Sequence, residues 1–375
     1  MGLHRKTQRF LKEMAMHPPD YLLLDPAIDP LRHTSALLRN GLVNHVPMAA
    51  EALVAMGQEE AAGPWVATHM ADTQPSHDGA PKSEFGNWRE ALGDFSHDAA
   101  WRAFFTSEVM GGEWQPVLDQ WSERLAPGLF AAATHGIIRV GHAVRALDHG
   151  DTFLRRRELA EGLALWASSY QALPTDFQSG GLAETPGRAL DLVPLVPEAQ
   201  RRNEGAITTA MEPLNDVASF APVIGYIDLE ADPATLANEI ATVSAQVFLD
   251  QVHTPLTAIV YTHSITAVAA ILNIAPHVSD KALRALLAYG WQAVCGLYAA
   301  YALKRAPGPG ILDTEMVPDI ASRAVAHGDD HVIKLSEACI RFYEATGDER
   351  FLMVPSHARA LLASDAQISK LIGDK

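Results

Sequence analysis

The sequence predicts an all-α protein, organised as a single large multi-helix domain with long irregular loops over residues 1–375. Of these residues 48% are hydrophobic but only 7% are aromatic, so Ala, Leu, Val and Ile supply most of the apolar surface. Ala and Leu are strong helix formers, and apolar residues recur with helical spacing along most of the chain. The sequence shows neither a series of strand patterns nor a repeat of fixed period. A short strand could form near 221–229 without changing this fold class.

The helical spacing of apolar residues defines the expected elements in chain order. In 98–109, for example, Trp101, Phe104, Phe105 and Val109 fall on one face. We interpret the three aromatic residues, Trp101, Phe104 and Phe105, as packing surface rather than as a platform for substrate. Pro318 fits the first turn of its helix, where a backbone N–H is not needed. The expected helices are 40–56, 98–109, 114–125, 129–147, 153–170, 234–249, 256–274, 280–302, 318–328 and 331–346.

Two stretches are predicted to be irregular. Residues 70–86 are rich in Pro, Gly, Ser, Asp and His, and residues 175–206 combine several Pro and Gly residues with little periodicity. Both are longer than ordinary connections between helices. We therefore expect lids or covers at these positions rather than linkers between domains.

The charge of the chain argues against nucleic acid as a partner. The formal net charge is −16, and an acidic surface repels phosphate backbones. The one basic run, 155–157, is followed at once by Glu158 and Glu161, which is typical of a solvated helix face.

Cysteine usage and hydropathy predict a cytoplasmic protein that does not enter a membrane. Cys295 and Cys339 lie in apolar helical segments, which is typical of buried free thiols in a reducing compartment. Residues 1–16 are basic and amphipathic and lack the apolar core of a signal peptide. The most apolar stretch, 256–275, is interrupted by polar residues, and no stretch reaches the ~18 uninterrupted apolar residues of a membrane span.

The familiar cofactor signatures are missing from the sequence. There is no GxGxxG after a strand, no Walker A loop, no GxSxG elbow and no HExxH. A dinucleotide such as NADPH would therefore bind in an atypical way or through a partner protein.

Histidines in apolar segments are the strongest functional signal. The chain has sixteen histidines, and five of them lie inside apolar helical segments: His45, His135, His142, His263 and His331. A buried imidazole must be hydrogen-bonded, and a single one is more often a satisfied core residue than a ligand. Several on separate helices of a bundle can converge on one centre, and neutral imidazoles suit Fe, Zn, Cu or Ni. The pattern therefore leaves a metal site and hydrogen-bonded core histidines as comparable alternatives.

Lys334 is an unusual companion of these histidines, because it follows the last of them by one helical turn. Lysine is rarely buried unless its charge is paired or its pKa is lowered. Asp329, Asp330 or Glu337 could pair with it. A neutral Lys334 could instead react with carbon dioxide to give a carbamate, which would act as a carboxylate ligand.

Together with neighbouring motifs, these segments resemble the questin-oxidase-like family. The resemblance covers about residues 35–345, and the order and spacing of the motifs carry it. The motifs are GLVNHVPMAAEAL at 41–53 with MG at 56–57, NWR at 87–89 with LG at 92–93, FF at 104–105 with GG at 111–112, THGIIR at 134–139 with GH at 141–142, THSITA at 262–267, and DDHVIK at 329–334.

The resemblance implies a helical enzyme that uses dioxygen to oxidise and cleave anthraquinone-type rings in secondary metabolism. Members of the family are similar to non-haem iron enzymes with four histidines and a carboxylated lysine at the metal. Carried over to this chain, the implied ligands are His45, His135, His263 and His331, with Lys334 as the carbamate.

Two further residues of the same motifs are the candidate catalytic residues, and both depart from the family pattern. His142 is expected to hold a ligand or a bound water by a ring nitrogen. Arg139 lies between His135 and His142 on one helix face, where it could pair with a carboxylate or hold an anionic group of the substrate.

The leading hypothesis is an oxygenase for an aromatic or quinone-type small molecule. The reaction would be an O2-dependent oxidation with ring cleavage, either Baeyer–Villiger-like or dioxygenase-like, at non-haem iron (Fe2+/Fe3+), with NADPH as reductant if one is needed. Its partners would be the substrate and O2, without nucleic acid or membrane, and the oligomeric state is left open. Two alternatives remain: a zinc-dependent hydrolase or lyase with the same histidines, and a non-catalytic helical binding protein that holds no metal.

Overall fold

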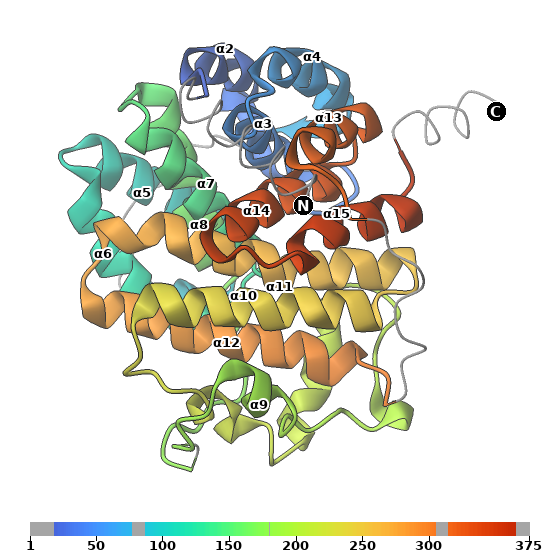
Figure 1. Cartoon of the computed structure of the whole chain (residues 1–375). Coiled ribbons are helices and arrows are strands. Elements are labelled where there is room, and N and C mark those ends of the chain that lie inside the picture. The colour runs from blue at the N-terminus through green and yellow to red at the C-terminus, as the bar shows by residue number, and fades with distance from the viewer. Residues whose placement is uncertain (1–18, 77–86, 180, 305–313, 365–375) are drawn as a thin grey trace. The chain divides into compact units, whose positions relative to one another are not determined.

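The computed structural model describes residues 19–76, 87–179, 181–304 and 314–364, and helices dominate it (Figure 1). The described residues form one small antiparallel sheet, in which β1 (Thr34–Leu38) pairs with β2 (Thr73–Pro75). The prediction of an all-α protein is confirmed. The strand that could have formed near 221–229 is instead the 3₁₀ helix η9 (Ala221–Gly225), followed by an isolated bridge at Ile227.

The chain forms two compact units, and each is assembled from separate segments. The first unit comprises Met1–Pro75, Ala245–Thr266 and Pro307–Lys375, and the second comprises Ser76–Ser244 and Ala267–Ala306. The unit boundaries fall inside α10 (Pro233–Gln251) and α11 (Pro255–Ile274). The prediction of a single domain stays a prediction.

In the first unit, α14 packs against α3, α13 and α15, and α3 is buried along almost its whole length. A hydrogen bond of 2.7 Å from Trp65 Nε1 to the Gly328 carbonyl ties α4 to the turn between α13 and α14. Gly328 has φ +84°, a left-handed conformation that favours glycine and ends α13. The elements of this unit are η1 (Tyr21–Leu23), α2 (Leu24–Ile28), η2 (Asp29–His33), β1, α3 (Val46–Ala55), α4 (Glu59–His69), η3 (Met70–Asp72), β2, α13 (Val317–His327), α14 (Asp330–Thr346) and α15 (Arg350–Leu361).

In the second unit, α8 packs closely against α5 and α7. The close approach needs small residues, since a Cβ on Gly136 would lie 2.7 Å from Trp166 Cβ. The elements of this unit are η4 (Trp88–Ala91), η5 (Phe95–His97), α5 (Asp98–Met110), α6 (Trp114–Leu125), η6 (Ala126–Gly128), α7 (His135–Asp148), α8 (Phe153–Ser168), α9 (Pro186–Leu190), η7 (Glu198–Gln200), η8 (Thr209–Asp216), η9, η10 (Ala275–His277) and α12 (Asp280–Tyr301).

Aromatic residues of α5 and α6 form part of the core of the second unit. The rings of Trp101 and Phe105 lie 5.6 and 4.9 Å from the ring of Trp121, centroid to centroid, and all three are fully buried. The interpretation as packing surface is confirmed for Trp101 and Phe105, while Phe104 is only half-buried. The prediction of a solvated face at 155–157 is wrong for Arg155, which is buried and donates hydrogen bonds to the carbonyls of Ala146 and Gly150.

Two helices begin later than the periodicity predicts. The helix expected from residue 40 begins at Val46, immediately before a proline that fits the first turn of a helix. The helix expected from residue 129 begins at His135, because Ala132, Ala133 and Thr134 all have positive φ angles. A left-handed run of residues cannot continue a right-handed helix.

Of the two predicted irregular stretches, residues 175–206 contain only the short helices α9 and η7 among the residues described. The first stretch includes η3 and β2, and its residues 77–86 lie outside the described residues. Whether either stretch is a lid stays a prediction.

One helical segment, Pro255–His277, is long and apolar enough to cross a membrane by length and composition. Of its most apolar window, 78% is buried inside the protein, which is also typical of a core helix of a soluble protein. Cys295 and Cys339 are buried free thiols, as predicted. The cytoplasmic location stays a prediction.

Candidate metal centre

The first unit places its candidate residues at the starts of α3 and α14 and inside α11. His45 immediately precedes α3. Asp329 caps α14, where its side chain accepts hydrogen bonds of 3.0 Å from the backbone N–H groups of His331 and Val332. This cap fixes the first turn of α14, which carries Asp330 and His331.

The side chains of His45, Asp330 and His331 meet. One carboxylate oxygen, Asp330 Oδ1, lies 2.6 Å from His45 Nδ1 and 2.9 Å from His331 Nδ1. The centroids of the two imidazole rings are 4.7 Å apart, and the rings are nearly perpendicular. The possible ligand atoms of the three residues all lie within 4.8 Å of one another, which is a spacing that a metal ion can bridge.

His263 and Lys334 lie beside this group. The ring of His263 is 5.8 Å from the ring of His331, centroid to centroid. Its Nδ1 lies 2.7 Å from the Ile259 carbonyl one turn earlier in α11 and therefore donates to it. Lys334 Nζ is 3.6 Å from Asp330 Oδ1, which allows an ion pair but not a hydrogen bond. The structure thus brings together the three histidines predicted in this unit and the predicted lysine.

Burial keeps the imidazoles of His45 and His263 neutral. Burial lowers the pKa of His45 from 6.5 to about 4, against the opposing effect of Asp330, and it lowers the pKa of His263 well below 6.5. Burial also lowers the pKa of Lys334, and the nearby carboxylates only partly oppose this. For Asp330, burial opposes ionisation, but His45, His331 and Lys334 outweigh it and hold the pKa of that carboxyl well below 3.8.

Asp330 is the member of the group that the sequence analysis did not select. The sequence predicts it only as a charge partner of Lys334. A carboxylate commonly accepts the second N–H of a metal-binding histidine, so the position directly before His331 was the available signal.

In the second unit, one buried face of α7 carries the other three candidates, His135, Arg139 and His142. His135 Nδ1 makes a short hydrogen bond to the Ala132 carbonyl within the left-handed run. His142 Nδ1 lies 3.5 Å from Arg145 Nη2, and a guanidinium can only donate.

Arg139 pairs with a buried carboxylate, which was one of the two predicted alternatives. Its Nε and Nη2 lie 3.1 and 2.8 Å from Glu158 Oε2, and both side chains are at most 10% exposed. Among the residues that the structure describes, none accepts a hydrogen bond from Arg139 Nη1, which is also buried.

Comparison with known proteins assigns the family. The sequence profile of the questin oxidase-like family matches residues 42–339, which is most of the chain. The chain belongs to the questin oxidase-like family. No curated protein matches it. Membership of this family indicates an oxidoreductase, and the matched region contains every residue that was selected as a candidate ligand or catalytic residue.

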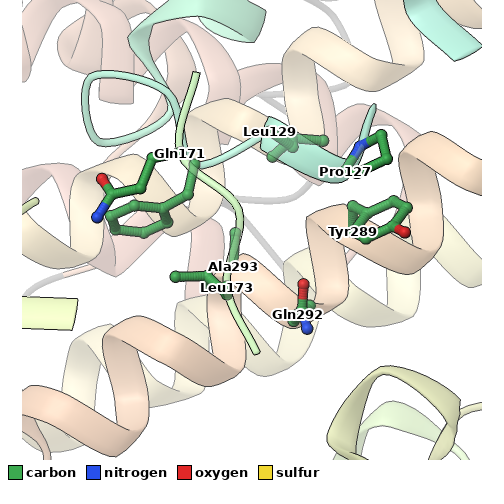
Figure 2. A pocket seen from close by; sticks show the side chains of 8 residues that line it. Pro127, Leu129, Gln171, Leu173, Tyr289, Gln292 and Ala293 are labelled. Carbon is green, nitrogen blue, oxygen red and sulfur yellow. The ribbon is translucent and has the colours of Figure 1, made fainter. Parts of the chain in front are cut away.

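This questin oxidase-like protein also has a small hollow in its second unit (Figure 2). Gln292, which lines it, already donates hydrogen bonds of 2.8 and 2.9 Å to the Pro174 carbonyl and to Thr175 Oγ1. The hollow is lined by Pro127, Leu129, Phe130, Gln171, Leu173, Tyr289, Gln292 and Ala293. None of these is a candidate ligand or catalytic residue, so the histidine groups remain the candidate site.

Proposed function

We propose that this questin oxidase-like protein is a non-haem iron oxygenase that uses O2 to oxidise and cleave an aromatic or quinone-type small molecule. The observation that carries the metal assignment is a tautomer shared by three of the four predicted histidine ligands. His45 directs Nδ1 at Asp330, and His135 and His263 direct Nδ1 at backbone carbonyls. Nδ1 of His331 lies 2.9 Å from the same Asp330 oxygen. A neutral imidazole that donates from Nδ1 carries its lone pair on Nε2, the form in which it binds a metal.

The depressed pKa values support the same assignment. A histidine must be deprotonated to bind a metal, so protons compete with the metal at an ordinary imidazole below neutral pH. The pKa of His45 at about 4 and the pKa of His263 well below 6.5 remove this competition over the physiological range. The residues present therefore fit a divalent metal with nitrogen ligands.

Lys334 is the proposed fifth ligand, as a carbamate. Carbamate formation needs a neutral amine: its nitrogen adds to the carbon of CO2 and loses a proton, which leaves a group with one negative charge. The burial of Lys334, at 3% exposure, and its lowered pKa support this chemistry. The proposed ligands are His45, His135, His263, His331 and Lys334, and the inclusion of His135, in the second unit, rests on the family resemblance.

When bound, the iron would supply activation of O2 and of the substrate. The chain's own contribution at this centre is to exclude water, since the side chains of His45, His263 and Lys334 are buried. Arg139, held in place by Glu158, has Nη1 available to bind an anionic oxygen of the substrate. We propose His142 as a positioning group for a ligand or a water molecule, and NADPH as the reductant if the reaction consumes electrons.

The first test is the metal content of protein purified without added metal, measured by elemental mass spectrometry, with electron paramagnetic resonance after exposure to air. We expect about one iron per chain with a high-spin ferric signal. Zinc alone would instead favour a hydrolase or lyase with the same ligands. A protein without metal, and fully stable in chelator, would favour a binding protein with structural histidines.

A matched pair of variants tests the ligand assignment. His263→Ala should lose most of the bound metal. His277→Ala should keep it, because His277 pairs with Asp148 at 2.7 Å and packs against Trp114. Equal metal content in the two variants would contradict the assignment. Oxygen consumption with a panel of hydroxyanthraquinones and hydroxynaphthoquinones then tests the substrate class.

A further inference from the structure

We propose that Asp330 is a positioning residue for the metal centre rather than a metal ligand. Through one oxygen it would hold His45 and His331 in the Nδ1–H tautomer and fix the directions in which both rings present Nε2. This inference rests on the proposed function, because it assigns a role toward the proposed metal. It concerns a residue outside the proposed ligand set.

The distances support a shared acceptor. Asp330 Oδ1 lies 2.6 Å from Nδ1 of His45 and 2.9 Å from Nδ1 of His331, and both are hydrogen-bonding distances. A carboxylate oxygen has two lone pairs, so one oxygen can accept from both rings. Lys334 Nζ, at 3.6 Å, does not compete for it. The oxygen nearest to both imidazoles is therefore engaged by the His45 N–H and lies within reach of Nδ1 of His331, a placement that suits a role in orienting the rings.

The backbone fixes both partners of this contact, because each lies at the start of a helix. Asp330 and His331 are the first two residues of α14, whose start is capped by Asp329. His45 immediately precedes α3, in which Pro47 restricts the backbone. The single contact thus joins positions 285 residues apart in the chain and couples the orientations of two rings.

Asp329 is an acidic neighbour with a different task. Its Oδ1 is 3.8 Å from His331 Nδ1, which is too far for a hydrogen bond, and it accepts backbone N–H groups instead. Asp329→Asn keeps an effective helix cap, because Asn is as good a capping residue as Asp. It is therefore the matched control for any change at Asp330.

The test is made first on metal-free protein labelled with ¹⁵N-histidine, whose long-range ¹H–¹⁵N spectra report the tautomer of each ring. Loss of single signals in His45→Gln and His331→Gln assigns the two rings. We expect both rings as Nδ1–H tautomers in the wild type and in Asp329→Asn. In Asp330→Ala at least one ring should shift toward the Nε2–H form, because its acceptor is gone.

The second measurement is the affinity for Co2+, used alone as a probe. Removing an outer carboxylate partner of a ligand histidine weakens metal binding by about 10–100-fold, so we expect a loss of this size in Asp330→Ala. Asp330→Asn should be intermediate, since an amide oxygen still accepts but carries no charge. It also replaces Asp330→Ala if the alanine variant does not fold.

The outcomes separate this inference from the proposed function. Weaker Co2+ binding with unchanged tautomers would show that Asp330 is a ligand, and would overturn the inference. Unchanged affinity and tautomers would overturn it as well. If the wild type binds no Co2+ but Asp330→Ala still shifts the tautomers, the proposed function fails while the role of Asp330 toward the two rings stands.

Discussion

The buried pair of Arg139 and Glu158 gives a prediction whose size follows from the structure. Both side chains are at most 10% exposed, and two N–H groups of Arg139 reach the same oxygen of Glu158. Removing one partner of such a pair leaves a buried charge without compensation, which costs about 3–5 kcal/mol. We therefore expect Arg139→Gln and Glu158→Gln each to lower the free energy of unfolding by an amount in this range.

The double variant is expected to recover much of that loss. Two neutral amides can hydrogen-bond to each other, and neither leaves a buried charge. The cost in Arg139→Gln/Glu158→Gln should therefore be smaller than the sum of the single costs, with a coupling energy of about 2–3 kcal/mol. The control is the exposed pair of Lys281 and Glu123, whose side chains are 77% and 45% exposed. The double-mutant cycle of this control pair should give a coupling energy of less than about 1 kcal/mol.

The assay is urea unfolding, followed by tryptophan fluorescence and far-UV circular dichroism, with linear extrapolation to water. Additive single costs, or a single variant as stable as the wild type, would refute the reasoning that this pair is desolvated. The double variant also separates pairing from substrate binding. If it oxidises anionic substrates as well as the wild type does, Arg139 contributes only to stability.

The remaining predictions concern packing, pH and the proposed carbamate. Gly141→Ala should lower the thermal unfolding midpoint, because the new Cβ would lie 2.5 Å from Ala270 Cβ and overpacking costs about 1–3 kcal/mol. The control is Gly187→Ala, where the nearest neighbour of the new Cβ lies at 3.8 Å. Equal midpoints in the two variants would contradict the predicted clash. In metal-free protein the pKa of His45 is about 4, against 6.5 in the unfolded chain, so the unfolded chain binds the extra proton between these values. Stability that is present above pH 6.5 is then lost as the pH falls toward 4, by roughly 3 kcal/mol. The urea unfolding midpoint of His45→Gln should depend less on pH than that of the wild type. An unchanged pH dependence would refute the lowered pKa of His45. Lys334→Ala should lose metal and regain part of it with added propionate, whose carboxylate replaces the carbamate. If elemental analysis finds no more metal in this variant with propionate than without it, the result counts against a carbamate.

Much of the fold could be predicted because helical periodicity is a local property. The segments with the clearest apolar spacing, such as those that became α5, α12 and α14, lie within a few residues of their predicted bounds. The start of α7 could not be predicted, since Ala132 and Ala133 are good helix formers that nevertheless adopt positive φ angles. Only tertiary packing can impose that conformation on alanine, and a single sequence carries no direct sign of it.

The candidate ligands were accessible to sequence reasoning for a related reason. A histidine inside an apolar helical segment must satisfy its ring nitrogens in the core, so its context alone marks it. Asp330 gave no such sign, because an acidic residue in the first turn of a helix is common and favourable whatever its side chain contacts. Its role depends on His45, which is 285 positions away in the chain.

His142 shows what hydrogen-bond partners add to periodicity. It lies seven positions after His135 on the same face of α7, and both are buried, so the sequence cannot rank them as ligands. In the structure, His135 donates from Nδ1 to a carbonyl, whereas Nδ1 of His142 faces Arg145, which can only donate. The proton of a neutral His142 is then on Nε2, so this ring is suited to donate a hydrogen bond to a ligand or a water molecule rather than to bind a metal through Nε2. Exchange of the two roles, with His142→Gln losing metal and His135→Gln keeping it, would contradict this distinction.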